Sequence, residues 1–453
     1  MKKRWIILMT MMVIIAIGGL FAGEPSFECD MSKIDGADVA WLITATIFVL
    51  MMTPGLSFFY GGMVGARNVI STMLQSFIAM GLISVLWVAF GFSLAFGDDI
   101  GGVLGNPFTF LMFQNVGADT YTTPTGHIMG GASIPLALFA LFQMKFAIIT
   151  PSLITGSFAE RVRFSGYLWF MLFFFVVIYC PLAHMTWHPD GLFLKWGVVD
   201  FAGGIVVHAS SGVAALAGAI FLGRRRSSTR SSEPANIPFV LLGAAMLWLG
   251  WFGFNGGSSL AADHIAVLAF LNTNTAGATA MMTWIFIDCL RGRKPSGMGA
   301  AVGAVVGLVA ITPCADVVTT SSSFIIAVLT TIVCNFAVYL PSKSGIDDAL
   351  DVFPTHGMGG IFATILTGVF SYTGLIHGGY TEFFNSIIGV VIVIAYTFVV
   401  SLALYWLTNK MIPMRVSIES EKRGLDMTQH DEAYAFSDSA EREIAEYFES
   451  HKS

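Results

Sequence analysis

The chain has 453 residues, of which 55% are hydrophobic and 11% are charged, and its formal net charge is −6. Because soluble domains carry about 25% charged residues, this composition excludes an ordinary soluble enzyme and predicts a membrane protein. No basic stripe suits nucleic acid. The five cysteines form no Cys-x-x-Cys pair, so we expect no disulfide framework, no metal site and no cofactor.

The first predicted element is an N-terminal segment, residues 1–22. It begins Met-Lys-Lys-Arg, continues through an apolar run and ends in small residues near Ala22, which is the order of a secretory signal peptide. The apolar run is slightly long for a signal, so a retained extra span is the alternative. Residues 23–37 then form a short extracytoplasmic segment.

Eleven apolar stretches long enough to cross a bilayer follow. Their predicted bounds are 38–61, 69–96, 131–157, 164–188, 201–222, 236–257, 263–290, 297–315, 319–341, 355–375 and 383–410. Together they make a transmembrane domain over residues 38–411. The predicted fold class is therefore an all-α polytopic membrane protein with eleven transmembrane helices.

Basic residues set the orientation of these spans. Arg67, Arg161 and the cluster around Arg224 fall at alternate connections, whereas the intervening connections have only Lys195 as a clear case. By the positive-inside rule, the first span starts outside and the chain ends in the cytoplasm. The odd number of spans requires the same arrangement. Residues 412–453 are then a cytoplasmic tail, too short for an enzyme domain, which we expect to regulate or dock.

A repeated cluster suggests internal symmetry. His208 follows Asp200 in the fifth span, and His356 follows Asp351 at the start of the tenth, with an aromatic residue after each acid. Transporters are often built from inverted repeats. We therefore predict two inverted five-helix halves with an eleventh helix left over.

The two histidines are the leading functional candidates. A titratable ring in hydrocarbon is costly, so its presence suggests a function. Neither His208 nor His356 has a Glu-x-x-His or His-x-x-x-His partner, which argues against metal ligation. Neutral imidazoles can hydrogen-bond each other and still face a passing solute. Satisfied packing residues are the alternative interpretation.

Aromatic residues near the outer ends of spans suggest a cation site. Trp187 is the ring type best suited to cation–π attraction, and Ser258 offers a hydroxyl lone pair. Phe146 lies in the third span, and Phe254 lies at the outer end of the sixth. An interfacial aromatic belt is the alternative. Asp200 would add negative field to such a site, or simply cap a helix.

Taken together, the motifs resemble the ammonium transporter family (Amt/Mep/Rhesus), on its Amt side, from about residue 37 to 435. The segments that carry the resemblance are TPGLSFFYGGMVGARNVIS, FQMKFA, SFAERVRF, AHMTW, DFAGGIVVH, WFGFNGGS, ITPCA, DVFPTHGMGG and GLDMTQHDEAY. Two positions depart from the family pattern. Lys145 stands where the residue is usually uncharged, and Asp431 stands where glycine is common.

The resemblance implies a role for each candidate residue. The outer ammonium-binding site would consist of Trp187, Ser258 and Phe146, and the gate would consist of Phe146 and Phe254. His208 and His356 would line the pore, and Asp200 would support recruitment and deprotonation. Asp426, His430 and Tyr434 would belong to the regulatory tail. It also implies a homotrimer in the lipid bilayer of the cell membrane, with ammonium or ammonia as substrate. A PII-type (GlnK) regulatory protein at the cytoplasmic face is a further expected partner.

The resulting hypothesis is recruitment of NH4+ outside, proton loss at the gate and passage of NH3 between the histidines into the cytoplasm, with the proton crossing separately. Two rival classes remain open. A membrane enzyme would use Asp200, His208 and Cys314, although no nucleophile–base spacing supports it. An ammonium sensor would report occupancy through its C-terminal tail, although the chain lacks a signalling domain.

Overall fold

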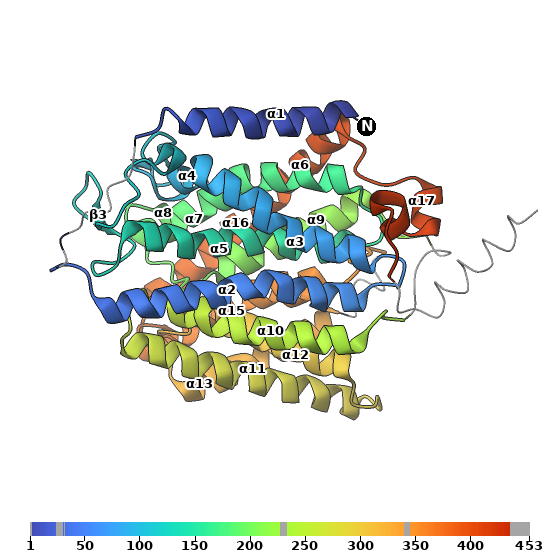
Figure 1. Ribbon diagram of the computed structural model, residues 1–453. Helices are drawn as coiled ribbons and strands as arrows, with labels where there is room; N and C mark the ends of the chain where they lie inside the picture. Colours follow the sequence, from blue (N-terminus) through green and yellow to red (C-terminus); the bar gives the residue numbers. More distant parts are fainter. Residues whose placement is uncertain (1, 24–29, 31, 227–232, 339–344, 435–453) are drawn as a thin grey trace, which may run out of the picture.

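The computed structural model describes residues 2–23, 30, 32–226, 233–338 and 345–434. These residues form a bundle of long helices running along a common direction (Figure 1). The strands among them make two short antiparallel hairpins, β1 (Asp99–Ile100) with β2 (Leu104–Gly105) and β3 (Tyr121–Thr122) with β4 (Ile128–Met129).

The helices follow the chain in order. They are α1 (Lys2–Gly19), α2 (Gly36–Met63), α3 (Val69–Leu86), η1 (Trp87–Gly91), α4 (Phe92–Phe96), η2 (Leu111–Phe113), α5 (Leu136–Leu153), η3 (Ile154–Phe158), α6 (Phe164–Phe174), η4 (Phe175–Tyr179), α7 (Cys180–Trp187), α8 (Leu192–Trp196), η5 (Gly204–Ala209), α9 (Ser210–Leu222), α10 (Ile237–Gly256), η6 (Gly257–Ser259), α11 (His264–Leu290), α12 (Gly297–Ile311), α13 (Thr320–Ala337), η7 (Phe353–Gly357), α15 (Met358–Phe370), η8 (Leu375–His377), α16 (Tyr380–Met411), α17 (Ile418–Arg423) and η9 (Asp426–His430).

The polytopic all-α fold is confirmed. Within the described residues, ten helical stretches from α2 to α16 are long and apolar enough to cross a membrane. The apolar helix α12, with 15 residues, is shorter and supplies the remaining predicted span. All eleven spans predicted from hydropathy therefore correspond to helices.

Some predicted boundaries are wrong. The third span begins at Leu136 rather than at residue 131, because the chain before it forms β4 and a loop that ends at Pro135. The fifth begins at Gly204 rather than 201, because the backbone of Phe201 and Ala202 bonds to a loop after α12 instead of continuing a helix. Hydropathy registers apolar composition, which does not mark the residue at which a helix begins; residues 202–203 are as buried as the helix they precede, whereas residues 131–135 are mostly half-buried.

Helix starts follow from capping residues in the sequence. The side-chain oxygens of Asp35, Asn236, Asp263 and Ser296 accept hydrogen bonds from free backbone N–H groups at the starts of α2, α10, α11 and α12. Each such cap stabilises a helix by about 1 kcal/mol. The polar capping residues between the apolar runs therefore determine where these spans begin.

The two ends of the bundle differ in charge. The tail elements α17 and η9 lie at the end opposite the β3–β4 hairpin (Figure 1). Basic side chains gather at the tail end: Arg67 donates to the Lys422 carbonyl, and Arg163 donates to the Pro413 carbonyl. By the positive-inside rule this is the cytoplasmic end, and the hairpins lie outside.

Helix α1 lies along the outside of the bundle (Figure 1). Leu8 packs against the core, whereas most of the other described side chains of α1 are exposed. Both a signal peptide before cleavage and a retained extra span fit this arrangement. Cleavage near Ala22 therefore stays a prediction.

Candidate functional site

The two candidate histidines meet at the centre of the bundle. His208 lies in η5 and His356 in η7, and their exposed fractions are 1% and 2%. The two Nδ1 atoms are 3.3 Å apart, and the ring centroids are 5.3 Å apart at an interplanar angle of 23°. One Nδ1 therefore donates a proton that the other accepts. Both rings sit on π-helical turns, a distortion that is common at functional sites.

Glycine makes this meeting possible. A Cβ atom on Gly212 would lie 2.1 Å from the backbone nitrogen of Gly357, the residue after His356. A Cβ atom on Gly360 would lie 2.4 Å from the Gly204 carbonyl oxygen and 2.9 Å from Cβ of His208. Since these neighbours are largely backbone, they cannot move aside. The glycines thus let the two histidine-bearing helices cross in contact.

The space beside the imidazoles is narrow and almost wholly apolar. The cavity there has a volume of about 10 Å³, which is about the room needed for one water-sized molecule. It is lined by Met52, Leu56, Phe59, Ile149, Leu153, Val207, His208, Leu247, Trp251, Phe254, Val305 and His356. Among the described residues, the Nε2 atom of His208 is buried without a hydrogen-bond partner.

Two phenyl rings close this space from the outside. Phe146 of α5 and Phe254 of α10 stack with centroids 4.2 Å apart and an interplanar angle of 23°. Phe254 lines the cavity beside the histidines, whereas Phe146 lines a separate cavity nearer the outer surface. The stacked pair therefore stands between the two, as the gate assignment requires.

The outer cavity, which we call the vestibule, is larger and more polar. It has a volume of about 210 Å³ and is lined by Ile128, Gly130, Gly131, Phe139, Gln143, Phe146, Trp187, Pro189, Phe201, Ser258 and Leu260. The Trp187 ring stands edge-on to Phe146 with centroids 5.7 Å apart. The Ser258 hydroxyl donates to the Phe254 carbonyl at 2.7 Å, which leaves its lone pairs free to accept. The three predicted outer residues therefore share one cavity.

Asp200 organises the turn below the vestibule. Its Oδ1 accepts from the backbone N–H groups of Gly203 and Gly204 at 2.9 and 2.5 Å, and its Oδ2 accepts from Ile205 and Val206 at 2.9 and 3.2 Å. Trp187 donates its indole N–H to the Asp200 carbonyl. Each carboxylate oxygen already accepts two bonds, which favours the capping interpretation and leaves Asp200 to act on a cation only through its negative field.

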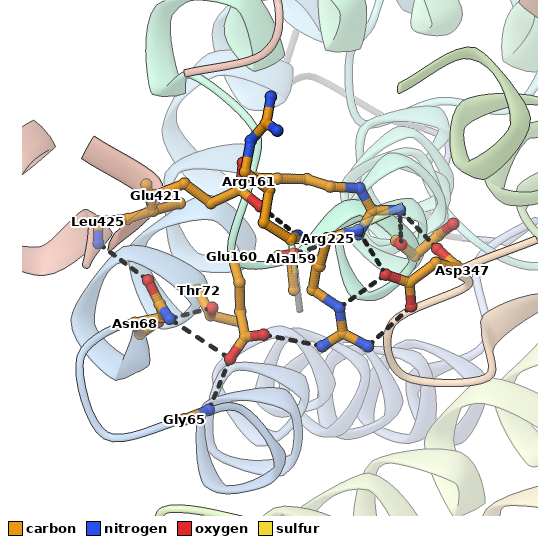
Figure 2. A network of polar contacts seen from close by, with 12 residues as sticks. Gly65, Asn68, Thr72, Ala159, Glu160, Arg161, Arg225, Asp347, Glu421 and Leu425 are labelled. Atoms are coloured by element: carbon orange, nitrogen blue, oxygen red, sulfur yellow. Dashed lines mark hydrogen bonds and ion pairs between the residues drawn. The ribbon is translucent and has the colours of Figure 1, made fainter. Parts of the chain in front are cut away.

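A cytoplasmic ion network that the sequence analysis did not anticipate joins three distant segments (Figure 2). Arg225 donates to Oε2 of Glu160 at 2.8 Å and to both carboxylate oxygens of Asp347 at 2.8 and 3.0 Å. Burial would raise the pKa of Asp347, but the hydrogen bonds and charge of Arg225 outweigh it and hold that pKa at about 2. Asp348, the next residue, accepts from the backbone N–H of Phe353 at the start of η7.

The C-terminal tail docks beside this network. Asp426 accepts from the backbone N–H groups of Ile70 and Ser71 at 3.1 and 2.7 Å, capping α3. Asn68 joins the two systems, because its oxygen accepts from the Leu425 N–H and its nitrogen donates to Glu160 (Figure 2). The tail beyond residue 434 lies outside the described residues.

The other predicted tail residues also make contacts at this surface. Nε2 of His430 is 3.2 Å from the Ser71 hydroxyl, and the Tyr434 hydroxyl accepts from Asn236 at 2.8 Å. Asp431 has a φ of 58°, in the left-handed region. Glycine is favoured there and aspartate is tolerated, which explains how Asp431 fits a position that glycine commonly occupies.

Three further features that the sequence raised lie away from the pore. Among the described residues, no group of three or more histidine, cysteine or acidic side chains could hold a metal ion. Cys314 is buried in a cluster apart from the histidine pair. The Lys145 ammonium lies 3.7 Å from the Met144 sulfur, and the structure gives no reason for its charge.

Comparisons with known proteins agree with this geometry. The profile of the Ammonium Transporter Family matches residues 40–435. The "Ammonium transporter" of Bacillus subtilis (strain 168) is 41% identical over 413 residues, covering 89% of this chain and 99% of its own length. The "Putative ammonium transporter" of Methanothermobacter thermautotrophicus is 40% identical over 410 residues, covering 88% and 98%.

Solved structures show the same likeness. The crystal structure of Saccharomyces cerevisiae Mep2 superposes with a TM-score of 0.80 at 31% identity, covering 88% of this chain and 93% of Mep2. A structure described as "Sensor Amt Protein" superposes with a TM-score of 0.78 at 28% identity, covering 87% and 98%. The relatives are transporters, so the membrane-enzyme alternative is rejected. The chain belongs to the Ammonium Transporter Family, and it is a multi-pass ammonium transporter of the cell membrane.

Proposed function

We propose that this transporter conducts ammonia, not ammonium, through its narrowest part. NH4+ binds in the vestibule against Trp187 and Ser258, loses a proton beside the Phe146–Phe254 stack, and passes the histidine pair as NH3. The observation that carries the proposal is the pair of buried imidazoles, 3.3 Å apart, lining an apolar space that fits about one small molecule. Such a space accepts a neutral solute far more readily than an ion.

Energetics explain how this route would exclude potassium. The pKa of ammonium lies roughly two units above neutral pH, so deprotonation costs about 3 kcal/mol at 1.36 kcal/mol per unit. Placing a bare charge at the bilayer centre costs at least about 2.5–3.5 kcal/mol and, by some estimates, far more. Potassium cannot lose its charge, so only ammonium can cross the apolar constriction as a neutral molecule.

The histidines supply the path for ammonia and for the proton. Their mutual Nδ1 hydrogen bond fixes the two rings, while Nε2 of His208 has no protein partner among the described residues. Ammonia can therefore exchange hydrogen bonds with the rings without displacing a competing protein group. The same imidazoles can pass a proton by switching tautomers. Transport would then carry net charge.

The experiment is ammonium-evoked current in proteoliposomes, with potassium as the competing ion. Replacing both rings (His208→Ala with His356→Ala) enlarges the space and admits water, which can solvate a cation. Selectivity for ammonium over potassium should fall at least about tenfold, or about 1.4 kcal/mol. His377→Ala, which removes an exposed histidine, is the matched control. Unchanged current and selectivity in the double variant would refute the route.

The expected assembly belongs to the same proposal. Family membership supports a homotrimer with one pore in each subunit, inverted halves within each subunit, and a PII-type partner at the cytoplasmic face. The docked tail, with Asp426, His430 and Tyr434 against the helix ends, offers a surface that such a partner could reorder. Copurification with the partner, and loss of it after truncation at residue 412, would test the last point.

An ammonium sensor remains the second candidate. The observations that favour it are the likeness to the protein described as "Sensor Amt Protein" and the direct contact between tail and loops. A sensor would show a regulatory phenotype that is lost on tail truncation while ammonium uptake stays normal. Loss of uptake and regulation together would favour transport alone.

A further inference from the structure

Gln143 occupies the wall of the vestibule, between two rings that also line it. Phe139, Gln143 and Phe146 are spaced four and three residues apart on α5, which places them on one face of the helix. All three line the 210 Å³ cavity. Gln143 has an exposed fraction of 8%, so its amide has left bulk water.

The Gln143 amide is unusual because it is both buried and unbonded. Its Oε1 has no hydrogen-bond partner, and neither amide atom bonds to any residue that the structure describes. A buried amide normally finds partners, because leaving one unpaired is costly. The Oε1 of Gln75 is also buried without a partner, but its Nε2 donates to the Ser71 hydroxyl, whereas neither amide atom of Gln143 is bonded. Gln143 lines the vestibule, so a turn of its unlocked amide would bring the buried oxygen to an occupant of that cavity.

We infer that the side-chain oxygen of Gln143 accepts an N–H of ammonium in the vestibule, beside Ser258 and the face of Trp187. This inference depends on the proposed recruitment site. An ion entering the cavity gives up water and must find acceptors for its N–H groups. The free lone pairs of Ser258 supply one, and Trp187 offers its π face. Because no hydrogen bond locks the Gln143 amide, it can turn its oxygen toward the ion.

The chemistry predicts an effect on affinity without an effect on selectivity. An amide oxygen is a ligand for potassium as well as for ammonium. Discrimination would still come from proton loss further in. Removing the Gln143 oxygen should therefore weaken the capture of ammonium and leave the maximal rate and the ammonium-over-potassium ratio unchanged.

The test is Gln143→Met, which keeps the length and bulk of the side chain but removes the oxygen. The ammonium concentration for half-maximal current in proteoliposomes should rise about tenfold, or about 1.4 kcal/mol, with maximal current retained. Without ammonium, the thermal unfolding midpoint should be unchanged or higher, since an unpaired polar group is lost. The matched control is Gln114→Met, in a loop outside the vestibule, where Gln114 bonds to the Phe108 carbonyl. It should leave half-saturation at the wild-type value.

A second variant guards against misfolding. Gln143→Glu retains an acceptor oxygen, so half-saturation should stay at or below the wild-type value. The inference is overturned if Gln143→Met saturates like the wild type, or if Gln143→Glu weakens capture as much as Gln143→Met. It is also overturned if maximal current and stability fall together with affinity, which is the signature of a packing role. If the wild-type protein itself gave no ammonium-evoked current, the proposed function would be refuted instead.

Discussion

The pore centre and the cytoplasmic ion network are both buried and both contain polar side chains, but they differ in how completely those side chains are hydrogen-bonded. At the pore centre, the histidine pair makes one mutual hydrogen bond, and His208 keeps an unpaired nitrogen toward an apolar space. In the network, the Arg225 guanidinium is shared between two carboxylates, Glu160 and Asp347.

This difference separates atoms that act on a solute from atoms that hold shape. A buried group with spare bonding capacity costs stability, so its survival suggests that a transient partner uses it. A saturated ion pair offers nothing to a solute, but it fixes the loops that meet there. We therefore expect changes in the network to act mainly on stability, and changes at the pore centre to act mainly on transport.

The largest expected effect would come from breaking the network. Arg225→Met leaves Glu160 and Asp347 buried without their shared cation, and unpairing a buried charge costs about 3–5 kcal/mol. The thermal unfolding midpoint in detergent should drop sharply, and the protein that remains folded should keep its preference for ammonium over potassium.

Arg163→Met is the matched control for that experiment. Arg163 donates to the Pro413 carbonyl near the surface, so its loss should cost no more than about 1 kcal/mol. If Arg225→Met were as stable as Arg163→Met, or if it lost selectivity without losing stability, the contrast between the two regions would be wrong.

A glycine-to-alanine substitution at the helix crossing tests whether the geometry of the pore centre controls transport. Gly212→Ala would place a methyl group 2.1 Å from the Gly357 backbone and force apart the helices that carry the histidines. Overpacking of this kind lowers the free energy of unfolding by about 1–3 kcal/mol. Here the added methyl group would also disturb the contact between the Nδ1 atoms of His208 and His356. We expect ammonium current to fall at least about tenfold at equal amounts of folded protein.

Gly81→Ala makes the same chemical change on α3, where an added Cβ meets nothing within 4 Å. It should keep wild-type current and gain slightly in stability, because alanine is a better helix former than glycine. Equal currents from Gly81→Ala and Gly212→Ala would show that the close helix crossing is not needed for the pore.

Features that depend on rare polar residues within long apolar segments could be predicted from the sequence. Hydropathy alone located eleven helices, and a histidine inside an apolar run, as at His208 and His356, stands out without any structure. The vestibule was predictable as a set, because Trp187 and Ser258 occur in motifs that resemble a known family.

The rest could not be predicted, for physical reasons. Arg225 is 65 residues from Glu160 and 122 from Asp347, and in the sequence its charge indicated only which side of the membrane it occupies. Gln143 looks like an ordinary polar residue in FQMKFA until the cavity beside it is known. The π-helical turns at η5 and η7 arise from tertiary packing and leave no sequence period.

The smallest expected effect concerns tail docking, where two titratable groups oppose each other. Burial raises the pKa of Asp426 to about 6 despite the backbone N–H groups that it caps, and nearby Glu432 adds to the rise. Docking through Asp426 therefore weakens as pH rises from about 4 to about 6 and is constant above. Burial lowers the pKa of His430, against the attraction of Glu432, so docking through His430 weakens as pH falls below 6.5.

Because these contributions have opposite signs, the wild-type tail should show a shallow dependence on pH, and single variants should separate them. In Asp426→Asn, docking should weaken only as pH falls below 6.5, whereas in His430→Gln it should strengthen as pH falls from about 6 to about 4. Hydrogen exchange over residues 418–434, corrected for intrinsic rates, measures docking, and one proton limits each change to about tenfold per pH unit. Profiles that move in the same direction in both variants would mean that these two side chains do not control the docked tail.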